Sequence, residues 1–446
     1  MTSPGASTPP RDLARVLRLG DLVWIVVGTV IGSGIFLVPG EVLVASDGDV
    51  GLAVSVWLVG GILSLLGALT YAELGAMDPR AGGLYVYLRD AFGRLPAFLY
   101  GWALFFVIGS GSVATLAAAF PRYVEQFVPL SGLAERLIAL GMIAAVTVVN
   151  VRGTRRGAAV QNWSTGIKVA ALLLITVLFL AIGTGLGSAD VRVFDTPLTP
   201  RALSHAGVGM VAVLWAYEGW HYVTFSAGET IEPQRVFARG IVAGTVAIVA
   251  IYLLANLGYV AALGPTGVAE STRVAGDAVE KLFGAQWGQL AAVPILVSIF
   301  GAANGIQLTA PRVFYAMARD RLFFARLAEV HPRFGTPAVA VMASAVWSAV
   351  LALSGTFEQL LTYVVFIGWI FYALAAAAVF VYRARRPDAP RPFRTPGYPA
   401  TPILFILVAA AFAGNTLWNR PLETLIGLGI VVLGLPAYLV WRRRAI

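Results

Sequence analysis

The chain has 446 residues, of which 58% are hydrophobic and only 12% are charged. Soluble domains carry about 25% charged residues, so this composition excludes an ordinary soluble protein and predicts a polytopic membrane protein. The formal net charge of +9 does not indicate a nucleic-acid partner, because the basic residues follow the predicted membrane topology. The chain contains no cysteine, which excludes a disulfide framework and a disulfide-linked partner subunit.

Twelve apolar segments are long enough to cross a bilayer, which takes about 20 helical residues. No connecting loop is long enough for a separate catalytic or signalling domain. We therefore predict an all-α polytopic membrane protein with 12 transmembrane helices. In chain order, the predicted spans cover residues 22–44, 52–76, 96–119, 132–150, 159–184, 206–227, 237–263, 287–317, 338–355, 357–382, 401–419 and 421–441.

Lysine and arginine are concentrated on one side of this predicted topology. With an internal N-terminus, 24 of the 32 basic residues lie on the internal side, seven lie on the external side, and Lys168 lies within the membrane. The positive-inside rule then places both termini in the cytoplasm. We predict a disordered cytoplasmic tail over residues 1–19. The apolar segment that follows is too long for a signal-peptide core and is predicted to be a retained span.

The first apolar segment is interrupted halfway by Gly32-Ser33-Gly34. Glycine costs a helix roughly 1 kcal/mol relative to alanine, so these residues predict a helix that stops and restarts. Irregular backbone at membrane depth is tolerated only where it is buried in protein or lines a wet cavity. The freed N–H groups suit a substrate carboxylate, Ser33 adds a hydroxyl donor, and Ile31 belongs to the same predicted site. The alternative is close helix packing, because Gly28 and Gly32 form a GxxxG pair.

The sixth segment contains a second break, at Glu218-Gly219. Three roles are open for a carboxylate there: holding a substrate amine, receiving a proton, or bonding freed backbone N–H groups. Trp215, one turn earlier, is either a gate over the substrate or an ordinary core aromatic. The other members of this predicted site are Ala216 and, as weaker cavity candidates, Tyr217 and His221.

Spans 1–5 and 6–10 each open with a broken helix, which is the arrangement expected of an inverted-repeat transporter. This prediction depends on the placement of the breaks, since the two halves share no visible sequence identity. We predict a transport core over residues 20–384. The predicted cytoplasmic link, helices 11 and 12 and the C-terminal tail, over residues 385–446, lie outside it.

Lys168 is one of two lysines in the chain and lies about ten residues into span 5. At 1.5 Å per residue it is about 15 Å deep, near the middle of a hydrocarbon core about 30 Å thick. Intramembrane ionisable residues are functional candidates by default. The predicted role is a fixed ammonium between spans 1 and 8; proton coupling and a lysine that leans toward the headgroups are the alternatives. Asn304 in span 8 either lines the path or bonds neighbouring helices.

The remaining polar residues receive weaker interpretations. Glu73, Glu229 and Arg312 lie near the cytoplasmic ends of spans 2, 6 and 8, where structural or solvated pairing is favoured over a salt-bridge gate. The Gly-rich loop 78–85 is either a re-entrant segment or a tight turn. The three histidines fall in separate segments without metal-ligand spacing, so no metal or other cofactor is predicted. The sequence shows no nucleophile–base arrangement, so an enzyme is not predicted.

Several stretches together carry a family resemblance. They are Gly28-Thr29-Val30-Ile31-Gly32-Ser33-Gly34-Ile35-Phe36, Tyr71-Ala72-Glu73-Leu74-Gly75, Gln161 to Lys168, Trp215-Ala216-Tyr217-Glu218-Gly219-Trp220 continuing through Glu229, Pro233 and Arg235, Phe300-Gly301, Asn304-Gly305 and Arg391-Pro392. Over about residues 18–443 the chain resembles the amino acid–polyamine–organocation superfamily, in particular the L-type amino acid transporter group. The resemblance implies a LeuT-type 5+5 inverted repeat, alternating access, and sodium-independent transport of α-amino acids, often by obligatory exchange.

The same resemblance implies residue roles. The span 1 glycines would bind the carboxylate, span 6 carbonyls the amine, Trp215 would hold the gating aromatic position, and Lys168 would stand in for sodium. Two departures from the family pattern matter. Glu218 stands where many neutral carriers have a small residue, which leaves room for cationic substrates or proton coupling. His221 stands where asparagine is frequent, which leaves the side-chain selectivity open. Eukaryotic relatives pair with a glycoprotein subunit through a cysteine; since this chain has none, we expect a stand-alone prokaryotic carrier.

We therefore expect a sodium-independent exchanger of small or medium neutral L-amino acids in the cell inner membrane. The nearest alternative is a proton-coupled or cationic amino acid or polyamine carrier that uses Glu218. An alternative of a different class is a membrane-embedded amino acid sensor, which would bind its ligand without flux.

Overall fold

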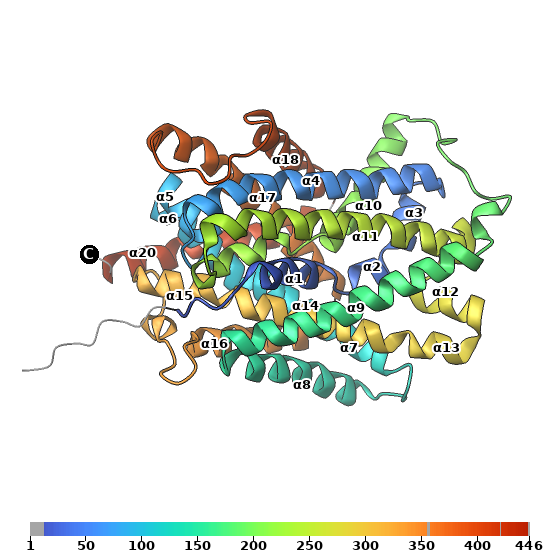
Figure 1. The fold of residues 1–446 in the computed structure, drawn as a ribbon, viewed down its shortest axis with the longest axis horizontal. Coiled ribbons are helices and arrows are strands. Elements are labelled where there is room, and N and C mark those ends of the chain that lie inside the picture. The colour runs from blue at the N-terminus through green and yellow to red at the C-terminus, as the bar shows by residue number, and fades with distance from the viewer. Residues whose placement is uncertain (1–12, 355–356, 420, 445–446) are drawn as a thin grey trace, which may run out of the picture.

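A computed structural model describes residues 13–354, 357–419 and 421–444 of the protein. Within these residues the chain is helical, and the β-type pairs are isolated bridges between Leu17 and Thr230 and between Asp49 and Arg192. The helices run roughly along one direction (Figure 1). We call the end of the bundle that carries α20 and the segment leading into α1, at the left of Figure 1, the terminal face, and the end that carries α12 and α13 the opposite face.

The helices have the following bounds. They are α1 (Leu19–Val30), α2 (Gly34–Leu37), α3 (Pro39–Ala45), α4 (Val50–Met77), α5 (Leu84–Phe92), α6 (Arg94–Ala103), η1 (Leu104–Ile108), α7 (Gly109–Val124), α8 (Gly132–Val151), α9 (Thr154–Ile182), η2 (Gly185–Gly187), α10 (Pro200–Ala216), η3 (Trp220–Glu229), α11 (Pro233–Glu270), α12 (Val274–Phe283), α13 (Ala285–Leu290), α14 (Ala292–Thr309), α15 (Pro311–Arg319), η4 (Ala325–Ala328), α16 (Ala338–Ser354), α17 (Phe357–Arg385), α18 (Ala400–Asn419), α19 (Pro421–Val432) and α20 (Gly434–Arg444).

Ten helices in the described part of the chain are long and apolar enough to cross a membrane, so the protein is a multi-pass membrane protein. They are α1–α2, α4, α6–α7, α8, α9, α11, α13–α15, α17, α18 and α19–α20. The all-helical prediction is confirmed, but the count of twelve spans is not. The predicted span 206–227 is divided by its break, and α16, in place of the predicted span 338–355, has 17 residues, which is about 26 Å of helix.

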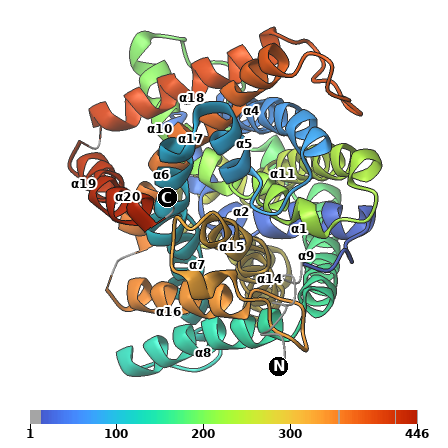
Figure 2. The ribbon, with the colours of Figure 1, turned by 90° about the vertical axis from the view of Figure 1, so that its left-hand side faces the viewer.

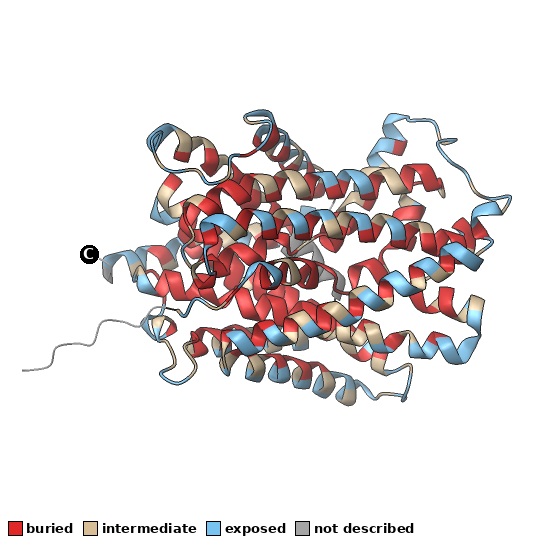
Figure 3. Cartoon of the chain, in the orientation of Figure 1, coloured by how far each residue is buried: buried red, intermediate tan, exposed pale blue. Residues whose placement is uncertain are grey.

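Burial divides the spanning helices into an inner and an outer group (Figure 3). The most apolar stretches of α1–α2 and α6–α7 are 78% and 83% buried, whereas those of α8 and α9 are 22% and 28% buried. Figure 2, which looks onto the terminal face, places α8, α9, α18 and α19 at the rim. The outer helices present apolar side chains outward, as lipid contact requires. The two inner segments therefore cross the middle of the bundle, where the candidate site lies.

Asp49 anchors the opposite face by capping the start of α4. Its carboxylate accepts hydrogen bonds from the backbone N–H of Leu52 at 3.0 Å, Phe194 at 3.0 Å, Asp195 at 2.8 Å and Thr196 at 3.0 Å. Burial raises the pKa of Asp49, but these four N–H donors outweigh that effect and hold it at about 2. The ionised cap therefore joins the first turn of α4 to the long connection between α9 and α10.

The segment before α1 is better ordered than the sequence predicts. Residues 1–12 of the predicted tail lie outside the described residues, but the N–H groups of Val16 and Leu17 bond the Glu229 carbonyl at 2.8 and 2.9 Å. Leu17 is fully buried, and its carbonyl accepts a bond from the N–H of Ile231 at 2.8 Å. Burial of Leu17 and pairing of its backbone fix residues 16 and 17 against the end of η3, so the prediction of a disordered tail is wrong for them.

Candidate substrate site between two interrupted helices

Both helix breaks expected from the sequence are present. α1 ends at Val30 and α2 begins at Gly34, while α10 ends at Ala216 and η3 begins at Trp220. The two breaks pack against each other. A Cβ atom added at Gly34 would lie 2.9 Å from both the Cα and the Cβ of Ala216. Gly34 therefore permits the close approach of two backbones, for which a larger residue leaves no room.

The second break requires glycine for its conformation as well. Gly219 has a φ of +125°, a region in which residues with a Cβ are strained. A Cβ at this position would also lie 3.0 Å from the Cγ2 of Thr29, on the last turn of α1. Each break thus places a glycine against the other interrupted helix.

A cavity of about 30 Å³ lies between the breaks. This volume holds on the order of one or two waters. Seven of the sequence-predicted site residues line it: Gly32, Ser33, Gly34, Trp215, Ala216, Glu218 and Gly219. The remaining wall consists of Thr29, Val30, Ser112, Leu116, Tyr222, Ala302 and Ile306. The wall therefore combines backbone, hydroxyl and carboxylate groups with small and branched apolar side chains.

Three of the predicted substrate-binding residues do not line this cavity. Ile31 is not in the cavity wall, and its carbonyl accepts bonds from Lys168 and Ser298. Tyr217 packs its ring against Trp57 and Tyr252, with ring centroids 5.9 and 5.1 Å apart. The geometry therefore makes Ile31 and Tyr217 part of the support behind the cavity wall.

His221 is also separated from the cavity. It is fully buried among aromatic rings, and its ring centroid lies 4.2 Å from that of Tyr372 and 4.6 Å from that of Tyr222. Its Nε2 is 3.8 Å from Oε1 of Glu218, beyond hydrogen-bond distance. His221 therefore lies close to Glu218 but is not part of the cavity wall.

Lys168 reaches the first break from α9. Its Nζ donates to the carbonyl of Gly28 at 2.6 Å, to that of Ile31, and to that of Ser298 on α14 at 3.4 Å. The side chain is 1% exposed, so its ammonium has its partners inside the protein. The geometry agrees with an ammonium that joins the first and eighth spans; its role in transport stays a prediction.

Ser298 supplements these contacts from α14. Its hydroxyl lies 2.9 Å from the carbonyl oxygens of both Ile31 and Gly32. Together with Lys168, it satisfies the carbonyls that the end of α1 leaves without helical partners. The backbone of the first break is thus held from the side away from the cavity.

Tyr252 on α11 contacts both breaks at once. Its hydroxyl lies 3.1 Å from the carbonyl of Val30 and 3.0 Å from that of Ala216. Tyr252 is fully buried, so its contacts with these carbonyls are shielded from bulk water. Sequence reasoning missed this residue, because a tyrosine in a long apolar helix gives no signal of the two backbones that it reaches.

Glu218 projects from the second break into the cavity wall. Its Oε1 accepts a hydrogen bond from the hydroxyl of Tyr372 on α17 at 2.5 Å. The Tyr372 carbonyl in turn accepts a bond from Tyr71 on α4 at 2.8 Å. The Glu218 carboxylate is thereby positioned from α17 and does not bond freed N–H groups in the described structure. Tyr372 is a second residue that sequence reasoning missed, for the same reason as Tyr252.

Asn304 joins three helices and does not line the cavity. Its amide nitrogen donates to the carbonyl of Gly157 at 3.1 Å and to Oε1 of Gln161 at 2.9 Å, and its oxygen accepts a bond from Asn150 at 2.9 Å. These partners lie on α8 and α9, while Asn304 lies on α14. Of the two interpretations left open by the sequence, the geometry matches the helix-bonding one.

Buried ion pairs close the terminal face. Arg312 donates to Glu229 at 2.6 and 3.0 Å and to the hydroxyl of Thr154 at 2.8 Å, and Thr154 donates to Glu229 at 2.7 Å. Arg312 and Glu229 are both 0% exposed. Glu73 is likewise paired, with Arg383 at 2.7 Å. All three residues are therefore paired, as the favoured interpretation expects, and the Glu229 pair is buried rather than solvated.

The fold and this cavity define a polytopic membrane protein with a polar site enclosed by two interrupted helices. The sequence model of the amino acid permease family matches residues 17–431, so the chain belongs to that family of transporters. Within the described residues there is no group of three or more His, Cys, Asp or Glu side chains that could hold a metal ion.

Three relatives illustrate the similarity. The serine/threonine exchanger SteT of Bacillus subtilis is 33% identical over 440 residues, which covers 98% of this chain and 99% of the relative. The large neutral amino acids transporter small subunit 2 of Mus musculus is 33% identical, over 98% of this chain and 84% of the relative. The human cystine/glutamate transporter is 31% identical, over 100% of this chain and 90% of the relative. The predicted resemblance to L-type transporters of the superfamily is confirmed.

Proposed function

We propose that this protein is a sodium-independent exchanger of small or medium neutral L-amino acids that works by alternating access. The observation that carries the proposal is the meeting of the two breaks around one polar cavity. In this proposal the helices form a LeuT-type 5+5 inverted repeat of twelve spans, with residues 20–384 as the transport core and residues 385–446 outside it. Residues 1–19 precede the core, and the relatives that are named as exchangers or transporters support the same class of function.

The first break supplies the carboxylate end of the site. Its carbonyls are bonded by Lys168 and Ser298, and the N–H groups of Ile31 and Gly32 donate to the carbonyls of Val27 and Val30. The N–H groups that remain for an anion are those of Ser33 and Gly34. The Ser33 hydroxyl lines the cavity and has no partner among the described residues, although it is fully buried. A buried unpaired hydroxyl is destabilising by about 1–3 kcal/mol, so a ligand carboxylate that accepts its hydrogen bond is favoured there.

The second break supplies the ammonium end. Glu218 presents a carboxylate to the cavity, and the carbonyls of the break provide further acceptors. A zwitterionic α-amino acid complements this arrangement, because one break offers donors and the other offers acceptors. The apolar part of the wall, Leu116, Ala302 and Ile306, favours a neutral side chain. Trp215 lies beside Gly34 in this wall, where a gating aromatic is expected.

The contacts of Lys168 support sodium independence. Sodium-coupled sites bind the ion with backbone carbonyls and hydroxyls where helices are interrupted. Here the carbonyls of Gly28, Ile31 and Ser298 surround an ammonium group instead. The side chain of Lys168 thus occupies the position of the ion, so transport in this proposal needs no sodium ion.

The charge distribution supports a cytoplasmic terminal face. Most arginines of the chain lie in segments that meet at this face, and positive loops remain inside. We therefore place the protein in the cell inner membrane with both termini in the cytoplasm. Because the chain has no cysteine, a carrier without a disulfide-linked subunit is part of the proposal.

The test is uptake of labelled alanine or serine into proteoliposomes, without sodium and without a pH gradient. Vesicles preloaded with unlabelled alanine are compared with empty vesicles. Uptake confined to preloaded vesicles supports exchange. Equal uptake into both would replace exchange by facilitated flux, and binding without any flux would point to a sensor.

A proton-coupled or cationic amino acid or polyamine carrier is the second candidate, because a carboxylate, Glu218, lines the cavity. Competition by lysine, arginine and a polyamine, and uptake driven by an imposed proton gradient, distinguish this candidate from the neutral exchanger. Strong competition by the cations together with gradient-driven uptake would favour it.

A further inference from the structure

A second and larger cavity, of about 390 Å³, opens on the terminal face. Four separate elements contribute an arginine to its wall: the segment before α1 (Arg15), the loop after α4 (Arg80), α5 (Arg89) and α15 (Arg319). α5 and α15 lie near the middle of this face (Figure 2). Volumes of 300–1,000 Å³ are typical of small-molecule sites. No role assigned to the helix breaks uses this cavity.

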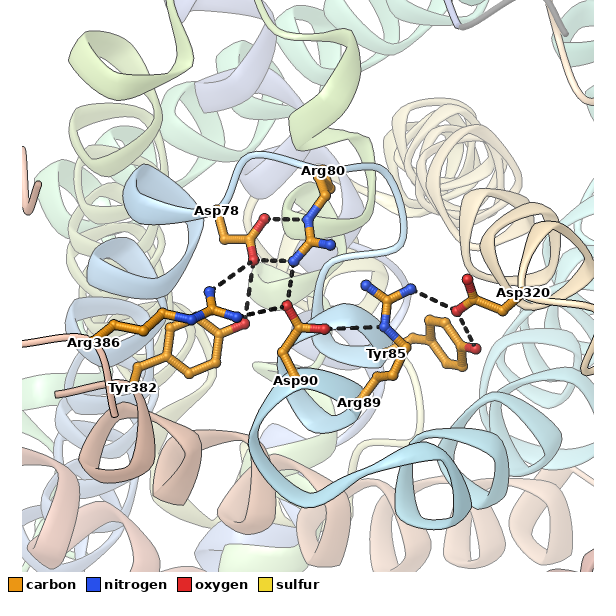
Figure 4. A network of polar contacts seen from close by, with 8 residues as sticks. All are labelled: Asp78, Arg80, Tyr85, Arg89, Asp90, Asp320, Tyr382 and Arg386. Carbon is orange, nitrogen blue, oxygen red and sulfur yellow. Dashed lines mark hydrogen bonds and ion pairs between the residues drawn. The ribbon is translucent and has the colours of Figure 1, made fainter. Parts of the chain in front are cut away.

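Two of these arginines are held in place by acidic residues (Figure 4). Arg80 donates from Nε to Asp78 at 2.5 Å and from Nη2 to Asp78 and to Asp90, the latter at 2.5 Å. Arg89 donates from Nε to Asp90 at 3.0 Å and from Nη1 to Asp320 at 2.6 Å. Within the described residues, Nη1 of Arg80 and Nη2 of Arg89 make no hydrogen bond. Each guanidinium is thus oriented by carboxylates and keeps one amino group for a further acceptor.

The other two arginines complete a basic wall. Arg15 is exposed, and Arg319 donates to the hydroxyl of Tyr315, itself part of the wall, at 2.9 Å. The acids that orient Arg80 and Arg89 stand behind the wall, since none of them lines the cavity. Their proximity raises the pKa of Arg80, so its charge is retained at any physiological pH.

We infer that this cavity binds the phosphate group of a small anion, which Arg15, Arg80, Arg89 and Arg319 hold together. Arginine presents several N–H donors in a planar fork that matches phosphate oxygens, and charge-assisted bonds of this kind are the strong ones. A soluble phosphate compound and an anionic lipid headgroup share this chemistry.

Occupancy would link two sets of elements. Arg15 lies in the segment that leads into α1, and Gly228, also in the wall, lies at the end of η3, so the wall includes the chain next to one interrupted helix and the end of the other. Arg89 and Arg319 lie on α5 and α15. A bound phosphate therefore ties the interrupted helices to their surroundings and slows exchange. This second consequence depends on the proposed function, whereas binding itself does not.

The test is thermal unfolding of the full chain in detergent, with pyrophosphate added against sodium chloride of equal ionic strength. We expect the unfolding midpoint to rise by about 2 °C or more at saturation. In Arg15→Gln and in Arg15→Gln/Arg319→Gln the apparent pyrophosphate affinity should fall by about 10-fold or more. Arg326→Gln, an exposed arginine of η4 outside the cavity, should respond as the wild type does.

A second arm uses nanodiscs of phosphatidylglycerol and of phosphatidylcholine, each with the wild type and the double variant. A stabilisation by phosphatidylglycerol that the double variant loses, without a pyrophosphate effect, supports the site with a lipid headgroup as its ligand. An effect of equal size in wild type and double variant, or no effect in either arm, overturns the inference. Phosphate binding is measured independently of exchange. If binding persists in a chain that shows no measurable transport, only the proposed function is contradicted.

Discussion

The two helix breaks meet at one cavity but are held in opposite ways. At the first break, the carbonyls of Gly28 and Ile31 are bonded by an ammonium from α9. At the second break, a carboxylate, that of Glu218, is bonded by a hydroxyl from α17. At the first break the carbonyls are bonded and the Ser33 hydroxyl has no partner among the described residues, while the second break presents the Glu218 carboxylate to the cavity. This difference explains why the pair complements a zwitterion better than either break alone does.

The largest effect is expected where the two breaks touch. In Gly34→Ala the new Cβ would lie 2.9 Å from the backbone of Ala216, and neither half-helix can shift without opening the cavity. Overpacking of this kind is destabilising by typically 1–3 kcal/mol, so exchange should fall by about 100-fold. Gly166→Ala on α9 is the control, because its Cβ would meet no atom within 4 Å. Normal exchange by Gly34→Ala would contradict the assignment of the substrate site to the contact between the two breaks.

Removal of the cation at the first break should have the next largest effect. Lys168→Met keeps the length of the side chain but leaves the carbonyls of Gly28 and Ile31 without their donor. Hydrogen bonds to charged groups contribute about 1.5–3 kcal/mol, so initial exchange rates should fall by at least about 10-fold. Lys281→Met, which removes the exposed lysine, should leave exchange unchanged. Wild-type kinetics in Lys168→Met would remove the lysine from the mechanism.

The link between the breaks should have a moderate effect. Tyr252→Phe removes the hydroxyl that reaches the carbonyls of Val30 and Ala216. A loss of about 1 kcal/mol corresponds to roughly a fivefold lower exchange rate. Tyr259→Phe is the matched control on the same helix, because the Tyr259 hydroxyl is buried and makes no hydrogen bond among the described residues. Equal rates for the two variants would show that the breaks act without this bridge.

The second break is tested by removing a charge without changing shape. Glu218→Gln still accepts the Tyr372 hydrogen bond but no longer attracts a cation. We expect a small change in alanine exchange, within about threefold, and a larger loss of any competition by lysine or arginine. Competition assays over a range of pH values measure both. If neither the substrate preference nor the pH profile differs from wild type, Glu218 has only a structural role.

The smallest effect on exchange is expected away from both breaks, at Asp49. The pKa of Asp49 lies at about 2 in the folded protein, below its ordinary value of 3.8. The stabilisation is therefore complete above pH 4 and is lost as the pH falls toward 2. Asp49→Asn should lower stability at neutral pH by about 1 kcal/mol and remove this acid-dependent decrease. Thermal unfolding between pH 3 and 7 measures it; a large loss of exchange with unchanged stability would contradict the assignment.

The sequence predicted the second break because a carboxylate beside a glycine is rare in an apolar segment. The glycines of the first break are a weaker signal, since Gly109-Ser110-Gly111 lies within the helix α7. Lys168 was found because an ionisable residue is likewise rare in an apolar segment. Tyr252 and Tyr372 were missed, since each acts on a break more than 30 residues away in the chain, and only the packing of α11 and α17 brings them there. His221 and Tyr217 were placed in the site from proximity in sequence, although the turn of η3 and the end of α10 direct them into aromatic clusters.

The absence of cysteine allows a direct test of the cavity as the substrate site. Ser33→Cys introduces a single thiol into the cavity wall, and Ser131→Cys places one on an exposed helix start as a control. The rate of alkylation is measured in proteoliposomes with and without saturating alanine. The account predicts that alanine slows alkylation at position 33 and leaves position 131 unchanged. Equal alkylation of Ser33→Cys with and without alanine, in a variant that still exchanges alanine, would contradict it.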